Sequence, residues 1–322
     1  MTFSRLFVTA MFAALFVAVC SLAACSRAHE DDRIVLGFSQ IGAESAWRLA
    51  NTESIKSAAA TSNIDLRFSD ADQKQENQIA AIRGFIAEKV DVIAFAPVVA
   101  TGWEPVLQEA KAAGIPVILT DRAVTADPTL YAGFLGSDFV EEGRKAARWA
   151  VGQFNPDRQV NIVQLEGTPG SAPASDRKSG FEEIIAQHPR FRIIHSVPGD
   201  FARAQAETAM AAILKSGTAR IHLVYAHNDD MALGAITAIE AAGLKPGKDI
   251  LLVSIDAVRA AFEAMIAGKL NATVECNPLM GPQLMTSVTE VVSGRPISKR
   301  TVVDESVFTM DTARQHIQTR KY

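Results

Sequence analysis

Polar and charged side chains stand where several predicted strands end, and their types suit a polyhydroxylated ligand. They are Ser39, Gln40, Glu44, Ser45, Trp47 and Arg48 at the end of a strand at 34–39, Asp121 and Arg122 after 115–119, Asp176, Arg177 and Lys178 beyond 160–165, His227, Asn228, Asp229 and Asp230 after 221–225, Asp256 closing 250–255, and Glu275 and Asn277 at the end of 272–276. A sugar hydroxyl both donates and accepts. Carboxylates accept from it, a guanidinium donates in a planar fork, and an amide does both. A tryptophan ring can cover the apolar face of a sugar.

The same residues also have structural interpretations, which the sequence leaves open. Asn228 is well placed to cap a helix at 228–242, since Asx residues are common at that position. Asp121 and Arg122 could form a local ion pair, and Trp47 could belong to the core, because most tryptophans are largely buried. The coincidence of such residues at several strand ends favours a binding site, because ligands of open α/β sheets lie beyond the carboxyl ends of the strands.

The elements that would position these residues alternate regularly along the chain. Short apolar runs such as "VIAFA" and "ILLVSI" read as strands buried on both faces, and Ala-rich amphipathic stretches such as 44–61, 75–89 and 139–153 read as helices. A single strand is predicted over 302–308. This alternation indicates an α/β fold with parallel sheets. Two sheets, one in each lobe, suit the length best, and a (β/α)8 barrel is the main alternative.

The first residues have the pattern of an export signal. Arg5 precedes the apolar run 6–19, and the run ends in small residues and "LAAC" at 22–25. This ending resembles a bacterial lipobox, which predicts a signal peptide at 1–24, lipidation of Cys25 and a polar tether at 25–32. Ordinary cleavage nearby, with Cys25 unmodified, is the alternative. If Cys25 is lipidated, we expect the protein to contact the membrane only through this lipid anchor.

Composition excludes several classes of function. The chain has 322 residues and a net charge of −4 without a basic face, so nucleic acid is not an expected partner. No second hydrophobic run reaches the length of a membrane span. After cleavage and lipidation Cys276 would be the remaining cysteine, which leaves no internal disulfide.

Enzymes are the first rival class, and the motifs argue against them. The sequence contains no G-x-S-x-G elbow, and "GFSQIGAES" is neither a dinucleotide fingerprint nor a P-loop. His222 and His227 lack a zinc-binding pattern, so no metal site and no cofactor are predicted. A glycosidase needs two carboxylates, and the sequence has enough Asp and Glu residues to supply them. The arginines at the same strand ends would, however, lower the pKa of a carboxyl group, which makes it a poor general acid. A repressor would begin with a helix-turn-helix in place of an export signal.

Several segments together resemble a known family. They are "GFSQIGAESAWR", "QKQENQI", "APVVATGWEPVL", "DR" at 121–122, "DRK" at 176–178, "YAHNDDMALGAI", "AGLKPGKDI" and "SIDAV". They are similar to the periplasmic sugar-binding proteins of ATP-driven (ABC) importers, in particular the galactofuranose-binding members, over about residues 33–310. The resemblance implies a two-lobed type I periplasmic-binding fold with three crossing strands. It places one lobe at 33–122 plus 277–303 and the other at 123–276 plus 304–322.

The resemblance also implies a function and a set of contacts. A monosaccharide would be trapped by closure of the lobes and passed to an ABC permease, by a monomer in the periplasm or cell envelope. A lipid-anchored sensor that feeds a chemoreceptor or kinase is the alternative. Ligand contacts would be made by Glu44, Ser45, Trp47, Arg48, Asp121, Arg122, Arg177, Asn228, Asp256 and Glu275.

Two positions depart from the pattern expected in that family. Alanine stands at 46 and at 257, where glycine is expected. A methyl group at 46 is expected to narrow the sugar pocket beside Trp47. A methyl group at 257 is expected to require backbone angles that are not specific to glycine.

Overall fold

The computed structural model describes residues 33–217, 219–303 and 305–322. The predicted signal peptide at 1–24, Cys25 and the whole tether at 25–32 lie outside the described residues. Residues Ile34–Tyr322 form one compact unit. In this part of the chain no helix has both the length and the hydropathy needed to cross a membrane.

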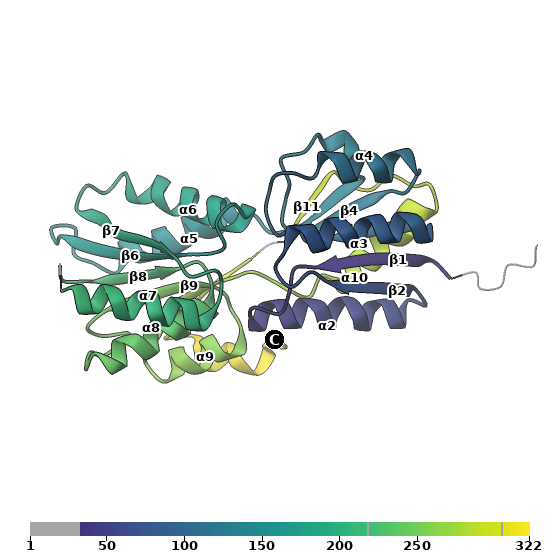
Figure 1. Ribbon diagram of the computed structural model, residues 1–322. Coiled ribbons are helices and arrows are strands. Elements are labelled where there is room, and N and C mark those ends of the chain that lie inside the picture. The colour runs from purple at the N-terminus through teal and green to yellow at the C-terminus, as the bar shows by residue number, and fades with distance from the viewer. Residues whose placement is uncertain (1–32, 218, 304) are drawn as a thin grey trace, which may run out of the picture. The chain divides into compact units, whose positions relative to one another are not determined.

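The first of two sheets is six-stranded and wholly parallel, in the order β11-β5-β4-β3-β1-β2. Its strands are β1 (Val35–Gln40), β2 (Asp65–Asp70), β3 (Val92–Phe95), β4 (Val117–Asp121), β5 (Gly133–Gly136) and β11 (Arg300–Val302). Its helices are α2 (Ala46–Thr61), α3 (Gln75–Glu88), α4 (Glu104–Ala112) and α10 (Gly281–Val292). Figure 1 shows this sheet with its own set of helices.

Both faces of this sheet are buried, which explains the continuous apolar runs of its strands. Along β3, Val92 and Ala94 belong to the core that includes residues of α2 and α10. Ile93 and Phe95 belong to a second core with residues of α3 and α4. Because side chains alternate along a strand, a run without polar residues fills both layers at once.

The second sheet is also six-stranded, in the order β12-β10-β9-β8-β6-β7, with β12 antiparallel to its neighbour. Its strands are β6 (Val160–Glu166), β7 (Phe191–Pro198), β8 (Leu223–Ala226), β9 (Leu251–Asp256), β10 (Ala272–Glu275) and β12 (Val307–Thr309). Its helices are α5 (Phe139–Gly152), α6 (Ala172–Ile185), α7 (Arg203–Ser216), α8 (Asp229–Ala241), α9 (Arg259–Ile266) and α11 (Ala313–His316). Two open sheets exclude the (β/α)8 barrel.

The helices α5 and α6 pack unusually close, and this contact positions Arg177. A Cβ atom on Gly143 of α5 would lie 2.2 Å from the carbonyl oxygen of Arg177 on α6. Any larger residue at 143 would push α6 away from α5. Glycine here therefore brings Arg177 against the first turns of α5.

The chain leaves the first sheet later than predicted. We expected the first lobe to end at Arg122, but β5 follows that point and pairs with β4 in the first sheet. Phe134 and Leu135 of β5 are buried in the cores of that sheet, so a boundary at 122 is wrong. The first connection between the sheets thus lies between Gly136 and the start of α5.

The predicted strand at 302–308 is in fact two short strands in different sheets. β11 ends at Val302 and pairs with β5, whereas β12 begins at Val307 and pairs with β10. The apolar residues of this stretch belong to two cores, and the chain passes from one sheet to the other between them. A second connection lies between the end of β10 and the start of α10.

Candidate functional site

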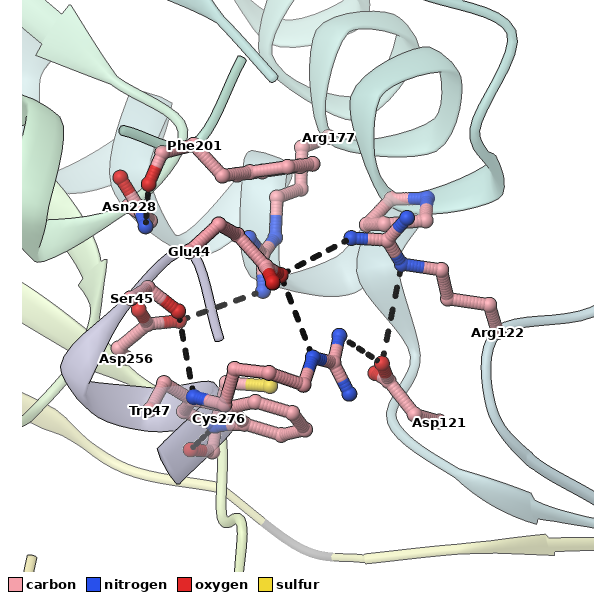
Figure 2. Close-up of a pocket in the computed structure, with 12 residues that line it drawn as sticks. Glu44, Ser45, Trp47, Asp121, Arg122, Arg177, Phe201, Asn228, Asp256 and Cys276 are labelled. Carbon is pink, nitrogen blue, oxygen red and sulfur yellow. Dashed lines mark hydrogen bonds and ion pairs between the residues drawn. The ribbon is translucent and has the colours of Figure 1, made fainter. Parts of the chain in front are cut away.

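One small cavity collects residues from the segments of both sheets (Figure 2). It is lined by Glu44, Ser45, Trp47, Arg48, Asp121, Arg122, Pro173, Arg177, Phe201, Asn228, Asp256 and Cys276. Every predicted contact residue except Glu275 is among them.

Glu275 does not line the cavity and is a correction to the predicted set. Its carboxylate pairs with Arg320, whose Nη1 lies 2.8 Å from Oε1, and it also accepts from the backbone N–H of Ser306. Side chains alternate at the end of β10, and it is the next residue, Cys276, that lines the cavity.

The start of α2 holds the first group of site residues in place. Ser45 is the N-cap of the helix and its hydroxyl accepts from the backbone N–H of Arg48 at 3.2 Å. The Arg48 guanidinium then contacts three acceptors, namely Asp121 Oδ2 at 2.6 Å, Glu44 Oε1 at 3.2 Å and Gln40 Oε1 at 3.2 Å. Burial disfavours its charge, but Asp121 and Glu44 outweigh burial and raise the pKa of Arg48. Arg48 is therefore a fixed cation at the base of the cavity.

Trp47 belongs both to the site and to the core, so neither interpretation excludes the other. The side chain is buried, packs in the main core and lines the cavity. Its indole N–H donates to the carbonyl oxygen of Cys276 at 2.7 Å, and the Arg48 guanidinium lies 4.7 Å from its ring centroid. These contacts fix the ring at the edge of the cavity, as Figure 2 shows.

Asp121 and Asp256 close strands β4 and β9 in strained backbone conformations. Asp121 has φ of 60° and Asp256 has φ of 126°, values that residues with a Cβ atom rarely adopt. Such strain is typical of functional sites, where the surrounding structure holds a side chain in an unfavourable geometry. At both strand ends the backbone twist turns a carboxylate towards the same cavity.

Glu44 and Arg122 place unsatisfied polar atoms at the cavity. Glu44 Oε2 and Arg122 Nε are buried and have no hydrogen-bond partner among the described residues. Arg122 Nη1 donates to Val98 O at 3.1 Å, but its Nε lies 3.7 Å from Asp121, beyond hydrogen-bond range. Burial and the neighbouring Arg48 lower the pKa of Arg122 to about 10. Two residues that line the cavity thus carry a buried acceptor and a buried donor without partners.

Arg177 comes from the second sheet's side and is held by two acceptors. Its Nε donates to Glu142 Oε2 at 2.7 Å, and its Nη1 donates to the backbone carbonyl of His227 at 2.6 Å. The remaining nitrogen, Nη2, lies 3.7 Å from Asp256 Oδ1 (Figure 2). Burial raises the pKa of Asp256 well above its usual range, and Arg177 opposes this shift.

Asn228 caps a helix and lines the cavity at the same time. Its Oδ1 accepts from Met231 N at 2.9 Å, and its Nδ2 donates to Phe201 O at 3.0 Å. The next two residues are structural. Asp229 accepts from Ser254 and Thr273, and Asp230 accepts from the backbone N–H of Ala46 at 2.8 Å across the two sets of helices.

Three lining residues were missed by the sequence analysis: Pro173, Phe201 and Cys276. Phe201 lies in the loop after β7 with φ of 60°, and its ring packs on Gly167, where a Cβ atom would lie 1.9 Å from the ring. The guanidinium of Arg122 lies 5.2 Å from the centroid of this ring. A glycine just after β6 is a weak signal that something approaches closely, but it does not reveal which residue.

Alanine stands at 46 and 257 where the resemblance predicts glycine, and neither alanine has the consequence that we expected. Ala46 is exposed and does not line the cavity, so its methyl group does not narrow the pocket beside Trp47. Ala257 has φ of 62°, in the left-handed region that favours glycine, so the prediction of ordinary backbone angles there is wrong. Its N–H donates to Thr273 Oγ1 at 3.1 Å and its side chain is buried, contacts that hold this conformation.

The charges of the cavity balance, which bears on the ligand it can take. Arg48, Arg122 and Arg177 stand against the carboxyl groups of Glu44, Asp121 and Asp256. A charged ligand would leave one set uncompensated in a buried site, which is costly. A neutral ligand with several hydroxyl groups satisfies both the free donor and the free acceptor.

Behind the cavity, one cluster of the described residues has ligand atoms close enough to hold a metal ion. Atoms of Glu142, Cys276 and Glu305 lie within 4.8 Å of one another. Burial raises the pKa of the Cys276 thiol well above its usual range, which disfavours a thiolate ligand. Arg177 already supplies a positive charge to Glu142.

Comparison with known proteins agrees with this geometry. The model of the family "Periplasmic binding protein domain" matches residues 36–296. A galactofuranose-binding protein of Escherichia coli is 45% identical over 292 residues, which are 89% of this chain and 92% of that protein.

Solved structures give the same result. A Mycobacterium smegmatis protein in complex with β-D-fucofuranose has a TM-score of 0.88 and 53% identity, covering 90% of this chain and 95% of the other. The binding component of the arabinose ABC transporter from Shewanella, bound to α- and β-L-arabinofuranose, has a TM-score of 0.86 and 44% identity, covering 89% and 95%. The chain therefore belongs to the periplasmic binding protein domain family.

Proposed function

We propose that this chain is the solute-binding protein of an ABC importer and that it captures a monosaccharide in its furanose form. The relatives at 44–53% identity bind galactofuranose, fucofuranose or arabinofuranose. The cavity of this chain is small, buried and charge-balanced, as a neutral sugar requires. The relatives support a sugar in the furanose form, and the polar groups of the cavity support a neutral ligand with several hydroxyl groups.

The observation that carries the proposal is the pair of buried polar atoms without partners, Glu44 Oε2 and Arg122 Nε. A buried unsatisfied group costs about 1–3 kcal/mol, so the site is poised for a ligand that supplies both a donor and an acceptor. One hydroxyl group can do this, and a sugar offers several in a fixed arrangement. Trp47 and Phe201 supply apolar surfaces at the cavity for the C–H faces of the ring.

The binding step follows from the origin of the contacts. Glu44, Arg48, Asp121 and Arg122 are carried by the first sheet and its helices, whereas Arg177, Asn228 and Asp256 are carried by the second. A sugar that touches both groups stabilises the arrangement in which they face each other. The size of that bias equals the difference in the sugar's affinity for the closed and open arrangements. A permease that recognises surfaces of both halves would then bind the loaded form.

A ligand screen tests the proposal directly. The purified chain without residues 1–24 is melted with L-arabinose, D-galactose, D-fucose, D-ribose and myo-inositol, and hits are titrated by calorimetry. Ligand binding to the folded state raises Tm by mass action, so a sugar that equilibrates with a furanose form is expected to raise it. Recovery of the sugar unchanged after long incubation supports transport, and chemical conversion would show an enzyme. No Tm increase with any sugar would overturn the proposal.

We further propose that the mature protein is exported and anchored to the membrane through acylated Cys25. This rests on "LAAC" at 22–25 after the apolar run. Metabolic labelling with a fatty-acid analogue tests it, with Cys25→Ser as the variant that loses the label. We expect the chain without its lipid anchor to be a monomer in solution, and light scattering measures this.

A further inference from the structure

A buried cluster joins the three segments that link the two sheets. Ser137 lies in the first link, Cys276 in the second and Glu305 in the third. The Ser137 hydroxyl donates to Glu305 Oε1 at 2.5 Å and lies 3.4 Å from the Cys276 sulfur. The backbone N–H of Asn277 also donates to Glu305 Oε1, at 3.3 Å. All three links thus meet at one carboxyl group, so any rotation of one half against the other changes this cluster.

Glu142 connects the same cluster to the cavity. Its side chain is fully buried, and its Oε2 accepts from Arg177 Nε at 2.7 Å. Its Oε1 is buried without a conventional donor among the described residues, beside the thiol of Cys276 and the carboxyl of Glu305. That atom is satisfied only if one of these neighbours brings a proton. Glu142 therefore stands between the ligand-facing Arg177 and the links.

The charges around the two carboxyl groups do not suffice to keep both ionised. Arg177 is the cation that pairs with Glu142, whereas Lys145 of α5 donates to the backbone oxygen of Glu305 and not to its carboxyl group. Arg300 of β11 donates to the backbone oxygen of Ser137. Two buried carboxylates that share one cation are expected to retain a proton.

The titration of Glu305 agrees with this arrangement. Burial and the negative charge of Glu142 raise the pKa of Glu305 to about 9, while the hydrogen bond from Ser137 opposes the shift. Burial raises the pKa of Glu142 as well, with Arg177 as the main opposing influence. A proton on Glu305 can be donated to Glu142 Oε1, which gives that atom its missing partner.

We propose that Glu142 and Glu305 share one proton and act as a positioning pair, which locks the three links together and holds Arg177 towards the sugar. The inference rests on the proposed function, because its consequence is seen in the affinity for sugar. Since the pKa of Glu305 is raised in the folded protein, the contribution of the pair is complete at low pH. It is lost as the pH rises through about 9, when two facing negative charges drive the links apart.

The affinity test uses D-galactose as the probe, by calorimetry at pH 7.0 and pH 9.5. The wild-type Kd is expected to rise about tenfold over this interval, as ionisation of one coupled group would cause. Glu305→Gln supplies an amide N–H in place of the proton, so it should bind as wild type at pH 7.0 and change less than about twofold. Glu142→Gln should weaken binding at both pH values by about tenfold, because Arg177 loses its anionic partner.

The matched control is Glu275→Gln, which alters a carboxylate at the end of β10 that pairs with Arg320 and does not line the cavity. This variant should keep the pH dependence of the wild type. A wild-type Kd that is constant from pH 7.0 to 9.5 would overturn the inference. So would a Glu305→Gln variant that follows the wild-type profile, because its proton could then play no part.

A second measurement without sugar separates this inference from the proposed function. Between pH 7.0 and 9.5 the Tm of the wild type should fall more steeply than that of Glu305→Gln, since only the wild type has a proton to lose at this site. Failure of D-galactose to bind the wild type would count against the proposed ligand, and the melting profiles would still decide the shared proton. Parallel melting profiles would refute it.

Discussion

The two walls of the cavity are built on different principles. On the first sheet's side, Arg48, Glu44, Asp121 and Arg122 form a charge network in which most contacts are made between site residues. Glu44 Oε2 and Arg122 Nε are buried without partners in this network. On the second sheet's side, most hydrogen bonds of the site residues are made to residues outside the cavity. Arg177 donates to Glu142 and to the carbonyl oxygen of His227. Asn228 accepts from the backbone N–H of Met231 at the start of α8 and donates to the carbonyl oxygen of Phe201.

The two kinds of support indicate which wall discriminates between ligands and which wall responds to their binding. Site residues that hold one another in place keep their geometry whether or not a sugar is bound. Their unpaired hydrogen-bonding atoms are therefore preorganised to recognise the ligand. Side chains tied to helix ends and to the links follow the movement of those elements. We therefore expect substitutions on the first wall to cost more affinity than those on the second.

The largest effect is expected for Arg122→Gln. The substitution removes a buried charged donor and leaves Asp121 and Glu44 with excess negative charge, so sugar affinity should fall about 100-fold by calorimetry, equivalent to about 2.7 kcal/mol. Arg83→Gln, which breaks an exposed ion pair with Glu109, is the matched control and should not change affinity. A loss smaller than that of the second-wall variants would reverse the comparison.

Asp256→Ala on the second wall should weaken binding about tenfold or more, because a sugar hydroxyl loses an acceptor and the guanidinium of Arg177 loses a nearby carboxyl group. Asp256→Asn sharpens the test. Burial raises the pKa of Asp256 well above its usual range, which favours the neutral carboxyl group, and the amide of asparagine resembles that neutral group in shape. The Asn variant should therefore keep most of the affinity, and an Asn variant as weak as the Ala variant would show that a carboxylate is needed.

Phe201→Leu should have a smaller effect, a loss of about three- to tenfold. The aromatic surface at the cavity is reduced, while the backbone carbonyl that accepts from Asn228 is kept. Stopped-flow measurement of sugar release should show the change mainly as faster dissociation. An unchanged release rate would mean that this ring serves the core and does not contact the sugar.

Asp230→Asn should have the smallest effect, about threefold. Asp230 accepts from Ala46 N at 2.8 Å and is held by Arg203, so it bridges the two walls without touching the cavity. The amide oxygen keeps the hydrogen bond but loses the charge that favours the start of α2. Small-angle scattering of the sugar-free protein should show a more extended average, and a scattering curve identical to wild type would refute this bridging role.

Much of the first wall was predictable from the sequence because its residues are close together along the chain. Glu44, Ser45, Trp47 and Arg48 fall on one loop and one helix turn, and Asp121 and Arg122 follow one strand. The helix cap and strand end orient these groups locally. The residues of the second wall were also predicted, but the groups that hold them in place were not. Glu142 and the carbonyl oxygen of His227 contact Arg177 from separate elements, so no local pattern indicates these partners.

The errors have a common physical cause. Glu275 and Cys276 are neighbours, and a single step along β10 decides which of them lines the cavity. Phe201 enters from a loop whose backbone adopts positive φ without a glycine, which no local pattern predicts. The late exit of the chain from the first sheet depends on β5 pairing with β4, a contact between strands of similar composition.

From its amino-acid order alone, this chain reveals alternating strands and helices, polar residues at strand ends and a small set of charged contact candidates. These follow from periodicity and from the rule that ligands lie at the carboxyl ends of parallel strands. Three-dimensional packing alone decided which sheet β5 joins, that Phe201 reaches the cavity, and that Glu142 and Glu305 meet where the three links cross. Those facts depend on contacts between residues far apart in the chain. Such contacts are determined by burial and by the pairing of polar groups, and not by the local preference of a segment for helix or strand.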